Sequence, residues 1–373
     1  MRVRCQDCGN EQELTNETWR CDCGGTWEVA DLPEFDPQKI DRDDYSIWRY
    51  GSLLGLDVSN PIKRMGVGWT PLVPIRLFDM QCALKLEYLS PSGSFKDRGV
   101  NAMVNQIIHM GVETVVEDSS GNAGASLAAH AARFGISAEI YVPEYASTAK
   151  QQQIRLYGAS LKAISGPRSA TEKAAQASIG GNRAYASHAF HPAYLAGQVT
   201  SAYELWEQLG GKAPDWILVP TAQGGQFLGN WFGFRQLLKA KLISRLPHLV
   251  AVQAAQIAPI HQAWTHGLDH IPKIDSPGQT LAEGVGIAGP VRGKRILQAL
   301  RESNGFTLAI DEIGIKTAYQ QAANLGYFVE PTSALVFAGL KHLQDQIPKE
   351  DLVVLSLTGN GLKGMPKDSY PLS

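Results

Sequence analysis

From about residue 70 onward, short apolar runs alternate with longer segments in which apolar residues recur at helical spacing. The run ALKLE at 83–87 predicts a strand, and the segment 98–110 has apolar side chains three and four positions apart, which predicts an amphipathic helix. A second helix is predicted from 123 up to Gly135, a typical residue for the end of a helix. Further strands are predicted at 114–118, 138–143, 161–164, 215–220, 249–254, 306–310 and 352–357.

This alternation of strands and helices is typical of an α/β protein whose parallel sheets are covered by helices on both faces. We expect two lobes, each with a mainly parallel sheet flanked by helices, and a small N-terminal cysteine ribbon. In open parallel sheets, ligands bind beyond the carboxyl ends of the strands, so motifs that directly follow strands are the candidates for chemistry. The expected units are the ribbon at 1–30, a linker and strand packing on the larger lobe at 31–82, the smaller lobe at 83–187 and the larger lobe at 188–373.

The composition is that of an ordinary globular enzyme. The chain has 373 residues, of which 44% are hydrophobic and 19% charged, and its formal net charge is −2. So small a net charge does not favour a nucleic acid as partner. No apolar run approaches the ~20 residues that a membrane-spanning helix needs, and the first residues lack the apolar stretch of a signal peptide. We therefore expect a cytoplasmic protein that does not bind membranes.

Four of the five cysteines, Cys5, Cys8, Cys21 and Cys23, lie close together at the start of the chain. Disulfides here would belong to a secreted mini-domain, which disagrees with the rest of the sequence. As thiolates, the four suit a tetrahedral zinc site, although the second pair is spaced C-x-C instead of the usual C-x-x-C. The alternative is a ribbon that folds without metal. Cys82 stands alone and is interpreted as a small buried apolar residue.

The stretch SPSGSFKDRG, residues 90–99, follows the strand at 83–87 and leads directly into the first predicted helix. Its Lys96 lies at the start of that helix, where the positive end of the helix dipole disfavours the charged ammonium. A neutral lysine amine is the form that attacks an aldehyde to give a Schiff base. The alternative is an ordinary surface lysine in front of a helix.

Three further motifs also follow strands. EDSSGNAGAS, residues 117–126, opens a helix, and its Asn122 offers both a donor and an acceptor. VPTAQGGQFLGNW, residues 219–231, has adjacent glycines whose amides can surround a phosphate, but it lacks the lysine of a nucleotide-binding loop, which favours a small phosphate monoester. LSLTGNGLKG, residues 355–364, has at the end of its strand Thr358, whose hydroxyl can bond a ring nitrogen. Each motif also has an ordinary interpretation as a polar or glycine turn.

Taken together and in this order, the motifs resemble those of pyridoxal-phosphate enzymes of fold type II, the tryptophan synthase β-like group. Within that group the chain is most similar to the threonine synthases. The resemblance runs over nearly the whole length and includes the cysteine pairs, WTPL at 69–72, EPTSA at 330–334 and LTGNGLK at 357–363. It implies a lyase that binds pyridoxal 5′-phosphate and acts on a small amino acid, often as a homodimer.

The resemblance implies a role for each motif. Lys96 would form the Schiff base with the cofactor and then act as acid and base at the α and β carbons of the substrate. Asn122 would bond the 3′-oxygen of the cofactor, and Thr358 would face the pyridine nitrogen as a neutral partner that tempers the ring as an electron sink. The phosphate loop of the family falls on Ala222, Gln223, Gly224, Gly225 and Gln226, where the backbone amides of the last three would bind the phosphate.

One segment departs from the threonine synthase pattern. Where these enzymes tend to have Asn-Pro-x-Arg-x-x-Gly-Gln, this chain reads HPAYLAGQ at 191–198, with Tyr194 in place of the arginine. By the resemblance, that arginine helps to bind the phosphate of O-phosphohomoserine, so a phosphorylated substrate would need another cation. The candidates are His188, His191, Lys150, Arg155 and Arg292.

The leading hypothesis is a threonine synthase-like lyase that converts O-phosphohomoserine into threonine and phosphate by β,γ-elimination and addition of water at Cβ. The alternative favoured by Tyr194 is a relative that performs β-replacement or α,β-elimination, as serine/threonine dehydratases or cysteate synthase do. A non-catalytic binding module is the third hypothesis, and the intact Lys96, Asn122 and Thr358 argue against it.

Overall fold

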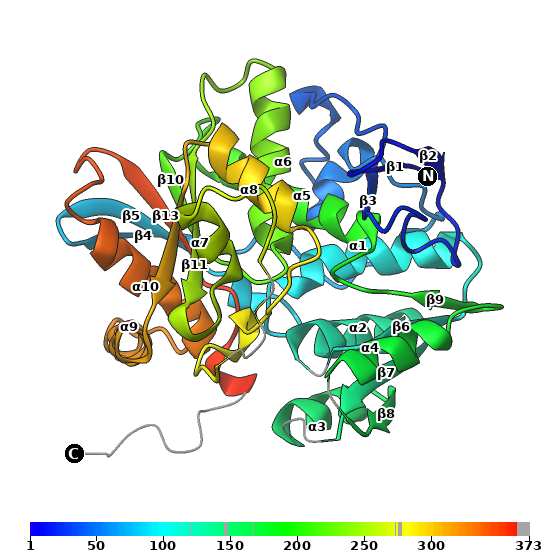
Figure 1. Cartoon of the computed structure of the whole chain (residues 1–373). Coiled ribbons are helices and arrows are strands. Elements are labelled where there is room, and N and C mark those ends of the chain that lie inside the picture. Colours follow the sequence, from blue (N-terminus) through cyan, green and yellow to red (C-terminus); the bar gives the residue numbers. More distant parts are fainter. Residues whose placement is uncertain (120, 145–147, 167, 273, 275–277, 364–373) are drawn as a thin grey trace.

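The computed structural model describes residues 1–119, 121–144, 148–166, 168–272, 274 and 278–363. Two sheets with their covering helices form two lobes, and a small third sheet lies at the N-terminus (Figure 1). This is the α/β architecture that the sequence predicts. The strands expected beyond residue 110 all form, and their bounds lie within one residue of those expected.

The larger lobe is built on a six-stranded sheet. Its strands are β4 (Leu72–Leu77), β5 (Met80–Lys85), β10 (Trp216–Pro220), β11 (His248–Ala254), β12 (Phe306–Ile310) and β13 (Leu352–Ser356). Their order is β12-β11-β10-β13-β5-β4, and all neighbours are parallel except the antiparallel hairpin of β4 and β5. The central strands are continuous apolar runs because helices cover both faces of the sheet.

The smaller lobe is built on a four-stranded sheet that is parallel throughout. Its strands are β6 (Thr114–Glu117), β7 (Ser137–Pro143), β8 (Ser160–Ile164) and β9 (Arg183–Tyr185), in the order β8-β7-β6-β9. Parallel strands place their carboxyl ends at one edge of the sheet. The residues that follow β6 and the residues that follow β9 therefore meet at the same edge.

The assignment of the strand at 83–87 to the smaller lobe is wrong. This segment forms β5, which lies in the larger sheet between β13 and β4, with Ala83 opposite Val354. An apolar run shows that a strand is buried but not which sheet it joins, and the partner β13 lies far away along the sequence. The chain leaves the larger sheet at Lys85 and enters the smaller lobe only through the helix that begins at Lys96.

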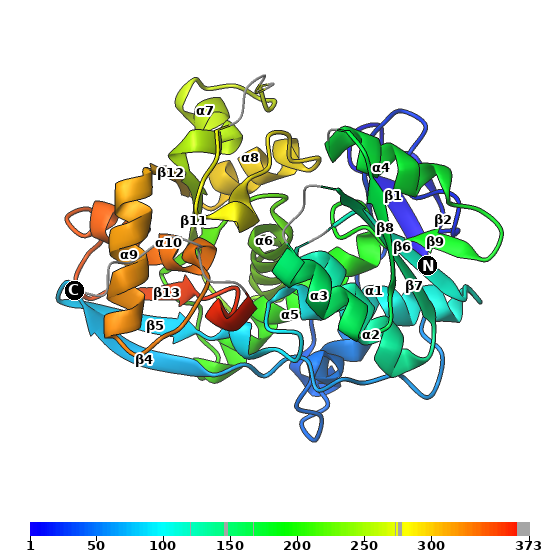
Figure 2. The same cartoon turned by 90° about the horizontal axis from the view of Figure 1, so that it is seen from below.

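Three long helices lie where the two lobes meet, and the largest hydrophobic core surrounds them. They are α1, α5 and α6. Helix α1 packs against α5, and α5 packs against α6 (Figure 2). The two predicted helices begin one or two residues earlier than expected. The helices are α1 (Lys96–His109), α2 (Asn122–Phe134), α3 (Thr148–Leu156), α4 (Arg168–Ala177), α5 (Pro192–Gln208), α6 (Gly225–Lys239), α7 (Pro259–Thr265), α8 (Gly293–Glu302), α9 (Glu312–Asn324) and α10 (Pro331–Leu343).

The N-terminal ribbon is an antiparallel sheet that rests on the segment after β9. Its strands are β1 (Arg2–Cys5), β2 (Glu11–Glu13) and β3 (Trp27–Val29), in the order β2-β1-β3. Trp19 contacts Tyr185 and Phe190 edge to face, with ring centroids 5.2 and 4.9 Å apart. Arg292 donates to the carbonyl oxygens of both Trp27 and Phe190, at 3.0 and 2.8 Å. The ribbon is therefore fixed to both lobes.

The segment that follows the ribbon packs against the main body of the chain. It contains two 3-10 helices, Pro37–Lys39 and Ile47–Leu53, and buries Phe35 and Tyr50 against helices α5 and α6. Among the residues that the structure describes, no helix is both long and apolar enough to cross a membrane.

Candidate active site

Lys96 is the first residue of α1, and the loop in front of it is fixed on the end of the larger sheet. The backbone N–H of Phe95 donates to the carbonyl oxygen of Thr358 at 3.0 Å. Gly93 has a φ of +85°, and a Cβ there would come within 3.1 Å of Lys363 Cδ, so the turn requires glycine. The loop therefore brings Lys96 close to Thr358.

The Lys96 amine lies among aromatic rings. Its Nζ is 4.6 Å from the ring centroid of Phe95 and 5.9 Å from that of Tyr194. Within the described part of the chain, no hydrogen bond or ion pair engages this amine. Burial lowers the pKa of Lys96 to about 8, and the charges of Glu117 and Glu330 partly oppose that shift. A larger fraction of the amine is therefore neutral at physiological pH than for an exposed lysine.

Asn122 is the first residue of α2 and reaches across to the larger lobe. Its Nδ2 donates to Glu330 Oε2 at 2.8 Å, while its Oδ1 is buried and has no hydrogen-bond partner among the described residues. A Cβ on Gly124 would collide with the carbonyl oxygen of Ser119, so the SSGN turn closes tightly on the helix. Ser120 of this motif lies outside the described residues. A free buried oxygen of this kind is ready to bond a ligand.

The predicted phosphate loop connects β10 to α6. Gly224 has a φ of +80° and a Cβ there would come within 2.5 Å of Ile296 Cδ1, and a Cβ on Gly225 would lie 2.8 Å from Tyr194 Cε1. Both positions therefore require glycine, and the loop ends at the N-terminus of a helix, where amides favour an anion. Gln226 is buried with both side-chain amide atoms unpaired within the described chain.

The other two residues of the loop contact protein. Gln223 Oε1 accepts the backbone N–H of Val291 at 3.0 Å, and Ala222 packs at the margin of the larger lobe's core. Of the loop residues that the sequence predicts, Gly224, Gly225 and Gln226 thus have backbone amides or side chains available for a ligand. Whether they bind phosphate stays a prediction.

Thr358 lies two residues after the end of β13, and its hydroxyl is paired with Ser333. The two Oγ atoms are 3.1 Å apart, and Ser333 Oγ also accepts the backbone N–H groups of Thr358 and Gly359 at 3.0 and 2.7 Å. Ser333 thus holds the turn that carries Thr358. The motif EPTSA alone does not reveal this role of Ser333, because its partner is known only once β13 and α10 are placed.

Tyr194 occupies the space between α1 and the phosphate loop. Only 1% of its surface is exposed, and a Cβ added to Gly99 or Gly225 would collide with its ring. Its hydroxyl has no hydrogen-bond partner among the described residues. Its ring therefore fills a position close to Lys96 without contributing a positive charge.

The cations proposed to replace the missing arginine are engaged elsewhere, are exposed, or lie outside the described residues. Arg292 is buried and donates only to neutral oxygens, and the side chain of Lys150 lies outside the described residues. His191 caps α5 by accepting the N–H of Ala193, and burial lowers the pKa of His191 to about 3, so it is neutral. Arg155 is exposed, and His188 contacts Glu117.

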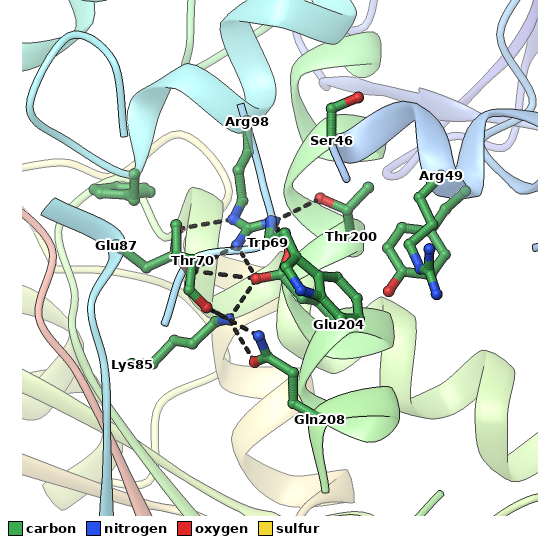
Figure 3. A network of polar contacts seen from close by, with 12 residues as sticks. Ser46, Arg49, Trp69, Thr70, Lys85, Glu87, Arg98, Thr200, Glu204 and Gln208 are labelled. Atoms are coloured by element: carbon green, nitrogen blue, oxygen red, sulfur yellow. Dashed lines mark hydrogen bonds and ion pairs between the residues drawn. The ribbon is translucent and has the colours of Figure 1, made fainter. Parts of the chain in front are cut away.

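A buried network of charges, which the sequence analysis misses, joins α1 to the larger lobe (Figure 3). Arg98, two residues after Lys96, donates to Glu87 at 2.7 and 2.8 Å and to Glu204 of α5 at 2.8 and 2.9 Å. Lys85, at the end of β5, donates to Glu204 and to the carbonyl oxygen of Thr70. The two cations and two anions are fully buried and balance one another.

The electrostatics of Glu204 show how tightly this network is paired. Burial by itself raises the pKa of Glu204, but Arg98 and Lys85 outweigh that effect and hold its pKa at about 2. The backbone N–H of Trp69 adds a further bond to Glu204, at 2.7 Å. The network therefore fixes the start of α1, and with it Lys96, relative to β5 and α5.

The four N-terminal cysteines meet in the ribbon. Their sulfur atoms all lie within 4.8 Å of one another, with Cys5 and Cys23 3.5 Å apart and Cys8 and Cys21 3.7 Å apart. Four sulfurs bound tetrahedrally at about 2.3 Å from one zinc ion would be separated by about 3.8 Å. The arrangement therefore suits a zinc ion. Cys82 is buried in the larger lobe's core, as the sequence predicts.

A family model described as pyridoxal-phosphate dependent enzyme matches residues 63–359. The chain belongs to this family. The threonine synthase of Methanocaldococcus jannaschii is 31% identical over 377 residues, covering 97% of this chain and 93% of the relative. The threonine synthase of Synechocystis is 34% identical and covers 84% of this chain and 82% of the relative. This confirms the family that the motifs indicate.

Solved structures agree on the fold of this pyridoxal-phosphate dependent enzyme. A threonine deaminase from T.th. superimposes with a TM-score of 0.67 at 25% identity, covering 80% of this chain and 94% of that one. Maize serine racemase superimposes with a TM-score of 0.66 at 21% identity, covering 78% and 88%, and shares the fold.

The residues at the site fit the cofactor of the family. The Lys96 amine is unpaired within the described chain and its pKa is lowered, which suits attachment to an aldehyde. Asn122 Oδ1 and the amide of Gln226 are buried polar groups without protein partners in that part of the chain, so a bound ligand would satisfy them. The roles that the family resemblance assigns to these residues stay predictions.

Proposed function

We propose that this chain is a lyase of the threonine synthase type, which converts O-phosphohomoserine and water into threonine and inorganic phosphate. The observation that carries the proposal is the likeness to threonine synthases of several organisms over most of the chain. The unpaired amine of Lys96 adds the chemistry that this reaction requires. The substrate is a small amino acid both for this function and for the second candidate function described below.

Bound pyridoxal phosphate supplies an aldehyde that an amine can attack and a ring that accepts electrons from the α carbon of an amino acid. Lys96 provides the amine, and its lowered pKa lets it take protons from the α and β carbons of the substrate near neutral pH. Asn122 and Thr358 would bond the 3′-oxygen and the ring nitrogen of the cofactor, and the amides of Gly224 and Gly225 would bind its phosphate. These assignments rest on the family resemblance together with the contacts described above.

The reaction predicts equal release of two products. Purified enzyme incubated with O-phosphohomoserine is expected to release inorganic phosphate and to form threonine in equal amounts. Phosphate is measured colorimetrically and threonine by amino-acid analysis. Enzyme that shows the absorption of lysine-bound cofactor but releases no phosphate would contradict this substrate while leaving the family assignment intact.

A second candidate is favoured by Tyr194. Because Tyr194 occupies the arginine position and is itself neutral and buried, a phosphorylated side chain would lack that binding partner. A relative that performs β-replacement or α,β-elimination on an uncharged side chain would not need it. Serine, threonine, phosphoserine and O-phosphohomoserine tested side by side, with ketoacid and phosphate as readouts, separate the two. Ketoacid from serine or threonine, without phosphate release from O-phosphohomoserine, would establish this second candidate.

We also propose that the four cysteines of the ribbon bind one structural zinc ion. Protein purified without chelator is expected to contain about one zinc per chain, because four thiolates complete a closed tetrahedral site. Cys8→Ser is expected to lower the metal content and the thermal stability, since the ribbon is fixed to both lobes. Cys82→Ser, outside the cluster, is the control and keeps the zinc. Only traces of metal in the wild-type protein would show that the ribbon folds without zinc.

A further inference from the structure

The carboxylate of Glu117 is buried within electrostatic reach of Lys96 and is held by a histidine. Glu117 is the last residue of β6 and is fully buried. Its Oε2 accepts the backbone N–H of His188 at 3.1 Å, and its Oε1 lies 3.3 Å from His188 Nδ1. We propose that Glu117, held by His188, is a positioning residue that sets the protonation state of the Lys96 amine.

His188 and Lys96 both lie against the ring of Tyr194. The His188 and Tyr194 rings contact edge to face with centroids 6.0 Å apart, and Lys96 Nζ is 5.9 Å from the centroid of the same Tyr194 ring. Glu117 and Glu330 are the two carboxylates whose charges act most on the Lys96 ammonium. The tyrosine ring fills space beside these groups and brings no charge of its own, so the interaction between carboxylate and amine is little screened.

The other buried carboxylates around the site have protein donors that hold them. Asp97 accepts hydrogen bonds from Ser92, in the loop before α1, and from Ser126 of α2. Asp118 is bonded to the Tyr185 hydroxyl and paired with Arg168. By contrast, within the described part of the chain no lysine or arginine lies at ion-pair distance from Glu117. Its hydrogen-bond partner His188 is neutral, so no cation in direct contact balances the charge of Glu117.

The ionisation of both groups lies close to neutral pH. Burial raises the pKa of Glu117 to about 7, against the opposing influence of the His188 N–H and of the charges of Arg168 and Lys96. Burial lowers the pKa of Lys96 to about 8. The titratable and charged side chains facing Glu117 are Lys96 of α1, Arg168 of α4, Tyr185 of β9, Tyr194 of α5, and Asp118 and His188 from the strand ends.

The test is a pH titration of the visible absorption of the lysine-bound cofactor in the holoenzyme. A carboxylate stabilises a proton on the nearby lysine nitrogen, so its loss makes the protonated form less stable. Glu117→Gln is therefore expected to move the absorption midpoint to lower pH by ~1 unit. The acid limb of kcat, which reports the Lys96 amine in the substrate complex, is expected to move in the same direction. A purely structural role for Glu117 would change the stability or the amount of bound cofactor without moving the midpoint.

Two companion variants keep the test decisive. Asp118→Asn makes the same chemical change one residue further along, at a carboxylate paired with Arg168, and is expected to leave the midpoint in place. His188→Ala removes the ring whose Nδ1 lies 3.3 Å from Glu117 Oε1, so a smaller shift in the same direction is expected. If Glu117→Gln does not fold, His188→Ala decides the question.

The proposal is overturned if the variants bind cofactor and titrate at the wild-type midpoint, or if Asp118→Asn shifts it as far as Glu117→Gln does. The inference rests on the proposed attachment of the cofactor at Lys96, but the titration requires no substrate. The titration can therefore be interpreted even if the enzyme releases no phosphate from O-phosphohomoserine.

Discussion

Replacing Glu204 by glutamine is expected to lower the free energy of unfolding by about 3–5 kcal/mol, because it leaves buried cations without their partner. Glu204 accepts hydrogen bonds from both Arg98 and Lys85, and its pKa of about 2 shows that these cations outweigh the cost of burying its charge. A neutral amide cannot balance them. Among the described residues, Arg98 would then keep the carboxylate of Glu87, and Lys85 would keep only the neutral oxygens of Thr70 and Gln208.

Urea unfolding of the holoenzyme at neutral pH measures this effect. The stabilisation from Glu204 is fully present above the ordinary pKa of a glutamate and is lost only as the pH falls toward about 2, so neutral pH is the correct condition. Glu34→Gln is the matched control, because it makes the same change in an exposed pair with Lys239 and is expected to leave the midpoint unchanged. An unfolding midpoint of Glu204→Gln equal to that of wild type would show that the network contributes nothing.

The buried charge network also links the stability of the chain to the position of Lys96. Arg98 lies two residues after Lys96 on the same helix, and Glu204 lies on α5, which also carries Tyr194. The start of α1 is thereby held between β5 and α5 at the place where the two lobes meet. Loss of Glu204 is therefore expected to affect the position of Lys96 as well as the stability of the whole chain.

The sequence predicts where the motifs lie relative to the strands, while the roles of their residues stay predictions. Lys96, Asn122, Thr358 and the glycine loop each follow a strand, because parallel strands in an α/β fold place their ends where ligands bind. These motifs are contiguous, so a single turn carries each of them. The expected homodimer, the cytoplasmic location and the zinc ion stay predictions.

The parts that the sequence misses depend on residues far apart along the chain. The strand β5 is predicted, but its partner β13 can be identified only in the folded protein. The charges of Lys85, Arg98 and Glu204 look like ordinary surface charges until the fold brings them together in the interior. In the same way, Glu117 looks like the polar end of a strand until His188 is placed against it. Burial turns such residues into features that the sequence pattern does not show.

Lys96→Ala is expected to abolish activity, with a loss of at least ~10²–10⁴-fold from its acid–base role alone. Without the amine, the cofactor has no lysine to attach to at this position. Reduction with borohydride and peptide mapping are expected to find pyridoxyl-lysine at residue 96 in the wild type and not in the variant. Lys96→Arg, which keeps a positive charge but not a nucleophilic amine, is expected to be equally inactive, while Lys239→Ala at an exposed site keeps full activity.

The stability of the same variant separates chemistry from folding. Because burial lowers the pKa of Lys96, the folded protein disfavours its ammonium form, and that cost is largest below about pH 8. Lys96→Ala is therefore not expected to lower the unfolding midpoint, in contrast to Glu204→Gln. Urea unfolding of the two variants, both without cofactor, measures the difference. Residual activity in Lys96→Ala, or pyridoxyl-lysine at another position in the wild type, would show that a different residue holds the cofactor.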